Sequence, residues 1–333
     1  MKRILLVTIL LVIILSSHVS AISSNTLTLK LGWNTVEDSV RGVVAKKFKE
    51  VVEEKTNGNI IIENYCCELL GNAMEQIDAI KIGAQGLNLA GNQELSPIVE
   101  EISLFNLPFL FEDAEEGLAF SKSEIAQAWH DKLYERGIKL IRWYDLGFAQ
   151  ITNKVRPVHT ADDMKGLKMR AVSGATLAID SMKALGAAVT TMPYSELYMG
   201  LQTGVIDGQF NPVDAIYESK FYEVQEHLAM VNLFWYTFSL AMNRGIWESL
   251  DAENQAIFIE AADMANEAAI EYTNSLRDEY LSLLEDELEI TYVTGDALEG
   301  FREKLKPVYD NMNSQYPDVN KMLEWLENYR KNK

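Results

Sequence analysis

Residues 161–174 read Ala-Asp-Asp-Met-Lys-Gly-Leu-Lys-Met-Arg-Ala-Val-Ser-Gly, and residues 192–212 read Met-Pro-Tyr-Ser-Glu-Leu-Tyr-Met-Gly-Leu-Gln-Thr-Gly-Val-Ile-Asp-Gly-Gln-Phe-Asn-Pro. The first stretch contains a predicted strand, Leu167–Ala171, and Arg170 lies at its end. Asn211 lies in the turn that ends the second stretch. The guanidinium and the amide both donate hydrogen bonds, so this pair can hold an anion without transforming it.

The pattern around this segment is that of an α/β lobe. Strands and helices alternate in the order strand Leu167–Ala171, helix Ala175–Leu185, strand Ala187–Thr190, helix Tyr194–Thr203 and strand Ile206–Gln209. An earlier series has the same layout, with strand Leu27–Gly32, helix Arg41–Lys55, strand Ile60–Tyr65, helix Ala73–Ile82 and strand Gly86–Ala90. The sequence therefore predicts two lobes with a cleft at the carboxyl ends of their strands.

Further elements connect the two series. Leu104–Phe111 is apolar but contains Pro108, which favours a buried crossover over a long strand. We expect a helix at Glu115–Arg136 and a strand at Lys139–Gly147, with Gly147 as a hinge. Ala252–Leu288 predicts one helix of about 50 Å that braces both lobes, and two helices with a break near Thr273–Ser275 are the alternative.

The N-terminus has the pattern of a secretory signal peptide. Lys2 and Arg3 precede the apolar run Ile4–Leu15, and small residues end at Ala21. The run is shorter than the roughly 20 residues of a membrane helix, and no cysteine follows Ala21 to accept a lipid. We predict a signal peptide at 1–21 and an exported protein without a lipid anchor. A retained anchor is the alternative.

The composition excludes several kinds of partner. The sequence has 30 basic and 49 acidic residues, a net charge of −19. Such a surface repels nucleic acid and anionic lipid. It does not exclude a small anionic ligand, because charges farther apart than about 10 Å are largely screened at moderate salt.

The cysteines and histidines do not indicate a metal or a cofactor. Cys66 and Cys67 are adjacent, and their Cα atoms lie closer than the usual disulfide range of about 4.4–6.8 Å. We expect two free thiols, although an oxidising compartment leaves a disulfide open. His130, His159 and His227 are not at metal-ligand spacing from the cysteines.

The order of these motifs resembles the extracytoplasmic solute-binding receptors of tripartite ATP-independent periplasmic (TRAP) transporters. The matching residues are Gly71, Leu107-Pro108-Phe109, Asp163-Met164-Lys165-Gly166-Leu167-Lys168-Met169-Arg170, Gly204-Val205-Ile206-Asp207-Gly208-Gln209, Asn211-Pro212 and the long helix. The resemblance implies a two-lobed periplasmic-binding-protein-like fold, with a sheet flanked by helices in each lobe. We predict lobe I at residues 22–147 and about 236–272, and lobe II at 148–235 and about 273–333.

The resemblance also implies a binding site. Arg170 matches the residue that receives the ligand carboxylate, and Asn211 adds an amide donor to it. Other predicted contacts are Tyr194, Asn34, Ser173, Gln150, Asn92, Trp235 and Glu37. The alternatives are core packing for Tyr194 and Trp235 and helix capping for Asn34.

One position departs from the family pattern. Many members carry a second arginine where this chain has Ala149. The change predicts a single strong charge contact, and therefore a monocarboxylate with an apolar or hydroxylated body.

The predicted function is the binding of a small organic or sugar acid and its delivery by hinge closure. The expected partners are one large and one small membrane subunit, and the receptor is expected to be a monomer. A sensor component for a membrane kinase and an ABC-type binding protein are the alternatives. An enzyme is not expected, because the sequence lacks a Gly-x-Ser-x-Gly motif, a His-Glu-x-x-His motif and a phosphate loop.

Overall fold

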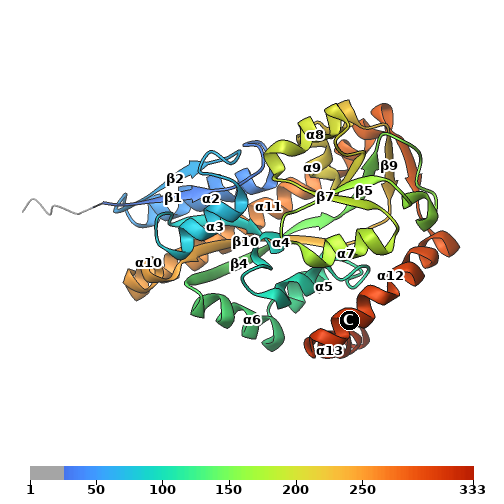
Figure 1. The fold of residues 1–333 in the computed structure, drawn as a ribbon. Coiled ribbons are helices and arrows are strands. Elements are labelled where there is room, and N and C mark those ends of the chain that lie inside the picture. Colours follow the sequence, from blue (N-terminus) through green and yellow to red (C-terminus); the bar gives the residue numbers. More distant parts are fainter. Residues whose placement is uncertain (1–25) are drawn as a thin grey trace, which may run out of the picture.

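The computed structural model describes residues 26–333, which form two α/β lobes side by side (Figure 1). The predicted signal peptide at 1–21 lies outside the described residues. Each lobe is built on one mixed sheet, and helices cover the sheets. The two-lobed fold expected from the sequence is confirmed.

The first sheet holds the N-terminal strands and two strands from later in the chain. Its spatial order is β2 (Ile60–Tyr65), β1 (Leu27–Gly32), β3 (Leu87–Gly91), β10 (Trp235–Asn243) and β4 (Ile138–Phe148). Strand β1 pairs in parallel with β2 and β3, whereas β10 is antiparallel to β3 and β4. The helices of this part are α2 (Val40–Lys55), α3 (Ala73–Lys81), α4 (Asn92–Leu95), η1 (Glu100–Asn106), α5 (Ala114–Phe120), α6 (Glu124–Glu135) and α10 (Arg244–Ser249).

The second sheet contains the segment that carries Arg170 and Asn211. Its order is β11 (Glu289–Tyr292), β9 (His227–Met230), β5 (Gln150–Asn153), β8 (Gly208–Asn211), β6 (Lys168–Ala171) and β7 (Ala188–Thr191). Strand β6 is parallel to β7 and β8, so Arg170 and Asn211 reach the same sheet edge. The helices here are η2 (Ala161–Met164), α7 (Thr176–Ala184), η3 (Tyr194–Glu196), α8 (Leu197–Thr203), α9 (Val213–Glu218) and η4 (Phe221–Val224).

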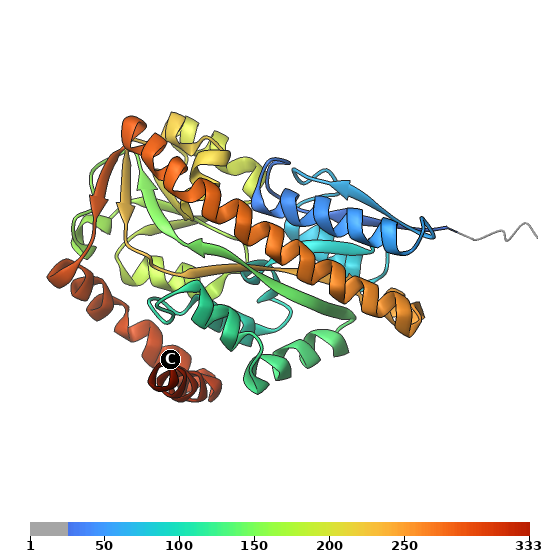
Figure 2. The same cartoon turned by 180° about the vertical axis from the view of Figure 1, so that it is seen from behind.

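A single long helix runs along both lobes. Helix α11 (Ala252–Glu287) has 36 residues, begins at the N-cap Asp251, and contains no break near Thr273. It packs against α2 and β4 on one side of the molecule and against α9 on the other (Figure 2). The prediction of one bracing helix is confirmed.

The sequence prediction of one helix over Glu115–Arg136 is wrong. Helix α5 ends before Ser121, and α6 starts after Ser123, whose hydroxyl accepts the N–H of Ala126 at 3.2 Å as an N-cap. Because Ser123 caps a new helix, the chain forms two helices here although the apolar periodicity continues through the serine.

The chain ends in two helices that return toward the first lobe. Helix α12 (Gly295–Gln315) packs on α7, whereas α13 (Asp318–Asn332) packs on α5 and α6. Arg330 of α13 donates two hydrogen bonds of 2.7 Å to Glu116 of α5. The last helix therefore lies against lobe I, although the sequence division placed residues 273–333 in lobe II.

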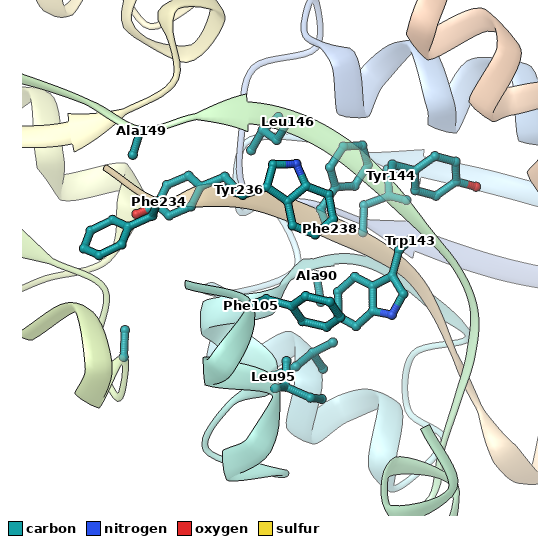
Figure 3. Close-up of a cluster of buried hydrophobic side chains, with 14 of the residues drawn as sticks. Ala90, Leu95, Phe105, Trp143, Tyr144, Leu146, Ala149, Phe234, Tyr236 and Phe238 are labelled. Atoms are coloured by element: carbon teal, nitrogen blue, oxygen red, sulfur yellow. The ribbon is translucent and has the colours of Figure 1, made fainter. Parts of the chain in front are cut away.

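An aromatic cluster fills the core of the first lobe next to the crossover strands. Phe105 contacts Trp143, with ring centroids 5.2 Å apart (Figure 3). The Phe105 ring also contacts Trp235, at a centroid distance of 5.8 Å. Trp235 is 1 % exposed, and its indole donates to Asp145 at 2.7 Å. This cluster anchors β10 where the chain enters the first sheet.

Close packing on Trp235 gives a stability prediction. A Cβ at Gly117 in α5 would lie 2.6 Å from the Trp235 ring. Gly117→Ala should therefore destabilise the protein by about 1–3 kcal/mol, because a buried ring must shift. In the control Gly300→Ala in α12, a Cβ meets nothing within 4 Å, and stability should rise by about 0.5–1 kcal/mol. Urea unfolding measures both, and equal stability of the two variants would contradict the packing described.

The expectation of free thiols is also wrong. The structure joins Cys66 and Cys67 in a vicinal disulfide, in the turn after β2. Cys67 and Glu68 have φ values of 61° and 59°, a turn conformation that brings neighbouring side chains together. The sequence argument relied on the separation of the two Cα atoms, which is 3.8 Å and therefore below the usual disulfide range.

Candidate ligand-binding site

A narrow cavity lies between the two lobes, at the carboxyl ends of β3 and β6. Its volume is about 40 Å³. Both lobes contribute polar side chains to its wall: Asn34, Arg41, Asn92, Gln93, Glu94 and Thr237 from the first, and Arg170, Tyr194 and Asn211 from the second. Leu146, Val172 and Tyr236 add apolar surface.

A wider chamber of about 220 Å³ continues from this cavity. The two spaces share Asn34, Glu94, Arg170, Val172 and Tyr194 in their walls. The chamber is also lined by Glu68, Asn72, Ala73, Met74, Ser173, Met192 and Pro193. A ligand that places one group at Arg170 can therefore extend its body into the chamber.

Arg170 is a buried cation without a protein counter-ion. Its side chain is 5 % exposed, and Nε and Nη2 donate to the carbonyl of Met192 at 3.1 and 2.9 Å. Among residues 26–333 no carboxylate lies within 4.0 Å of its guanidinium. Burial lowers the pKa of Arg170 from its ordinary value, with Tyr236 and Glu94 acting against this shift. Arginine nevertheless stays protonated in proteins, so the cavity contains a positive charge that an anion can neutralise.

Asn211 and Tyr194 lie beside Arg170. The Asn211 amide donates one hydrogen bond to Gln209, which leaves its second N–H available at the cavity. The Tyr194 ring lies 6.0 Å from the Arg170 guanidinium carbon, and its hydroxyl is hydrogen-bonded to Ser219 at 2.8 Å. The structure thus brings the predicted carboxylate pair together with the predicted aromatic.

Three further predicted residues reach the same space. Asn34, after β1, donates to Glu94 at 3.1 Å. Asn92 begins α4 and donates to Asn106 at 2.7 Å, whereas Ser173 lines the wider chamber. Asn34 does not cap the following helix, because Ser39 is the N-cap of α2.

Three predicted residues lie outside the cavity. Trp235 is in the aromatic core, and the neighbouring Tyr236 lines the cavity instead. Gln150 accepts the N–H groups of Val231 and Asn232 at 2.8 and 3.0 Å, so it stabilises the crossover. Glu37 is exposed and lies 3.4 Å from Lys46.

Sequence reasoning missed a second arginine. Arg41, in the first turn of α2, is 5 % exposed, and its guanidinium carbon lies 4.9 Å from the centroid of the Phe238 ring. Burial lowers its pKa, which Glu94 partly opposes. Arg41 shares a helix face with Val44, Ala45 and Phe48, and an arginine on an apolar face was the signal that could have revealed it.

Ala149 does not face an open charge site. It is fully buried where β4 passes into β5, and it lies near Phe234 in Figure 3. Its N–H donates to Phe234 at 2.8 Å, and its carbonyl accepts from Leu233 at 3.0 Å. The cavity nevertheless contains a second arginine, Arg41, which comes from lobe I.

No helix within residues 26–333 is long and apolar enough to cross a membrane. The same part of the chain contains no group of three or more histidine, cysteine or acidic side chains that could hold a metal ion.

Two α/β lobes with a charged cavity between them define a solute-binding protein. The chain belongs to the family described as bacterial extracellular solute-binding protein, family 7, whose model matches residues 32–315. Its relatives make it a solute-binding protein of the TRAP transporter type.

Similar proteins cover most of the chain. The C4-dicarboxylate-binding periplasmic protein of Rhodobacter capsulatus is 30% identical over 86% of this chain and 86% of its own length. A TRAP periplasmic solute-binding protein from Polaromonas sp. JS666, solved with D-erythronate, has a TM-score of 0.84 and 28% identity, and the match covers 90% of this chain and 98% of that one. A Haemophilus influenzae counterpart with L-gulonate has a TM-score of 0.85 and 26% identity, with 91% and 99% covered.

Proposed function

We propose that this protein binds a small monocarboxylate, an organic or sugar acid, outside the cytoplasm and delivers it to the membrane subunits of a TRAP transporter. The observation that carries the proposal is the buried Arg170, which has no counter-ion within 4.0 Å among the described residues. A carboxylate accepts two parallel hydrogen bonds from a guanidinium, and Asn211 can add a third. Two of the similar proteins were solved with the monocarboxylates D-erythronate and L-gulonate, whereas the Rhodobacter capsulatus relative is named a C4-dicarboxylate-binding protein.

The proposed mechanism is closure of the lobes over the ligand. Asp145 of lobe I accepts the Gly147 N–H at 2.9 Å beside the crossover. Arg277 of α11 lies 3.8 Å from Asp145 and 3.7 Å from Asp214 of lobe II, so the long helix is tied to both lobes. A ligand that contacts both walls of the cavity favours the closed state, which we propose the membrane subunits recognise.

We retain the predicted lobe boundaries with one change, which is that α13 belongs to lobe I because it packs on α5 and α6. We further propose that the receptor acts as a monomer and that one large and one small membrane subunit receive the ligand. Export through the N-terminal signal peptide, without a lipid anchor, is part of the same proposal.

A thermal-shift screen of the mature protein tests the proposed ligand class. Organic and sugar acids should raise the melting temperature, because a ligand that binds only the folded state stabilises it by mass action. At 100 times the dissociation constant the gain is about 2.7 kcal/mol. The corresponding amides and neutral sugars are the controls. Stabilisation by these neutral compounds, or by dicarboxylates alone, would contradict the proposal.

A further inference from the structure

The wall that lobe I presents to Arg170 contains polar atoms without partners. Buried atoms with no hydrogen-bond partner in the described part of the chain include Nε of Arg41, Nε2 of Gln93, Oδ1 of Asn34 and Oε1 of Glu68. The first two are donors and the last two are acceptors. Buried polar atoms are almost always paired in folded proteins, so these atoms indicate where a ligand supplies the missing partners.

Arg41 and Glu94 stand next to each other without forming an ion pair. A Cβ at Gly91 would lie 2.0 Å from Oε2 of Glu94 and 3.3 Å from Nη2 of Arg41, so both charged groups lie close to Gly91. The two charged groups are nevertheless more than 4.0 Å apart. A ligand hydroxyl that accepts a hydrogen bond from Arg41 and donates one to Glu94 would place the nitrogen and the oxygen that it joins about 4.5–5.5 Å apart.

The mixture of donors and acceptors discriminates between ligand groups. A second carboxylate on the ligand could accept from Arg41, but Glu94 and Glu68 would repel it and Asn34 Oδ1 would gain no donor. An ammonium group could donate to Glu94 but would be repelled by Arg41. Of these three groups, only a hydroxyl both donates and accepts without carrying a charge, so it satisfies both kinds of atom.

We propose that Arg41 and Glu94, with Asn34 and Gln93, form a hydroxyl-selective subsite opposite Arg170, so that the ligand is a monocarboxylate with one or more free hydroxyl groups. This inference rests on the proposed function, because Arg170 must first hold the carboxylate. Arg41 and Glu94 are then specificity-determining residues supplied by lobe I, and the chamber beside them receives the rest of the hydroxylated chain.

Calorimetry with a matched four-carbon series tests the subsite. The probes are erythronate and threonate, butanoate without hydroxyls, tartrate with a second carboxylate, and homoserine with an ammonium group. A matched six-carbon series is gluconate, hexanoate and glucarate. We expect the hydroxylated monocarboxylates of at least one series to bind at least about 10-fold more tightly than the other members, because a site built to bond a hydroxyl rejects analogues without one. Equal or tighter binding of butanoate and hexanoate, or of tartrate and glucarate, would overturn the inference.

Two variants assign the selectivity to its residues. Arg41→Gln should weaken the binding of hydroxylated monocarboxylates by at least about 10-fold. The affinity for the unsubstituted acids should stay within about 2-fold of the native value. Glu94→Gln removes the repulsion of a second carboxylate. It should raise the affinity for tartrate or glucarate by about 10-fold relative to that for the hydroxylated monocarboxylate of the same length. Circular dichroism checks that each variant folds, and either variant alone can overturn the assignment by leaving the selectivity unchanged.

The Arg170→Gln variant separates the two proposals. If no carboxylate binds, or if binding survives Arg170→Gln, the proposed function itself fails. If the acids bind in an Arg170-dependent way without regard to their hydroxyls, only the hydroxyl-selective subsite is refuted.

Discussion

Arg170→Gln is expected to weaken the binding of organic acids by about 2–5 kcal/mol, which is roughly 30- to several-thousand-fold in dissociation constant. The ligand carboxylate would lose a charged bidentate partner in a cavity that excludes most water. Arg170→Lys should restore only part of the loss, because an ammonium group cannot present the planar donor fork. Isothermal calorimetry with the tightest acid from the screen measures both variants.

Arg170 also has a structural role, which needs a matched control. Its two bonds to the Met192 carbonyl hold the loop before Tyr194. Arg156, in the same lobe but away from the cavity, likewise donates to two backbone carbonyls, those of Asp163 at 2.8 Å and Lys165 at 2.6 Å. Arg156→Gln should lower stability and leave affinity within about 2-fold. Equal affinities for the Arg170→Gln and Arg156→Gln variants would rule out Arg170 as the carboxylate residue.

Local patterns predicted the first half of each lobe well. Strands β1 and β2 have the predicted bounds. Strand β1 alternates apolar and polar residues, β2 begins with β-branched residues, and each is followed by a helix with a clear end. Strand β10 was not predicted as a strand, although residues 237–243 alternate polar or small side chains with apolar ones, and all nine of its residues are buried. It also pairs with β3, which is more than 140 positions away, and such pairing leaves no local signal.

The site was predictable where residues follow strand ends. Arg170, Asn211, Asn34, Asn92 and Ser173 all reach the cavity or its chamber. Arg41 was missed because an arginine in a helix is usually solvent-exposed, and its burial depends on Phe238 of a strand that the sequence did not reveal. That Tyr236 lines the cavity and Trp235 does not likewise depends on which face of β10 borders the cavity.

Glu218 is a half-buried acidic group between the two lobes. It ends α9, accepts the Tyr272 hydroxyl of α11 at 3.1 Å, and lines the rim together with Asn34 and Tyr194. The pKa of Glu218 is raised to about 8, mainly by burial and next by the nearby Asp214; Tyr272 and Arg41 act in the opposite direction, and Asp38 adds to the rise. Burial also raises the pKa of Asp214 to about 6, although Arg277 opposes this. In the folded, ligand-free protein Glu218 therefore keeps its proton up to about pH 8, whereas Asp214 loses its proton near pH 6.

This preference fixes the sign of a pH effect on stability. Between the unfolded pKa of about 4.5 and the folded value the native state binds more protons than the unfolded state, so the free energy of unfolding falls as the pH rises. For Glu218 the loss from pH 5 to pH 8 should be about 3 kcal/mol. Glu218→Gln keeps an acceptor for Tyr272 but carries no charge. It should be more stable than the native chain at pH 8, with a smaller difference at pH 5.

Urea unfolding of the ligand-free protein at pH 5, 6, 7 and 8 measures this difference, with Glu226→Gln as the control because Glu226 is exposed. The Glu226→Gln profile should run parallel to that of the native chain. A Glu218→Gln profile that is also parallel would mean that water reaches Glu218 and that its charge has no cost. If the stability difference between the Glu218→Gln variant and the native chain is the same with and without an Arg170-bound acid, closure of the cleft and ionisation of Glu218 are not coupled, because a closed, drier state would raise the pKa of Glu218 and widen that difference.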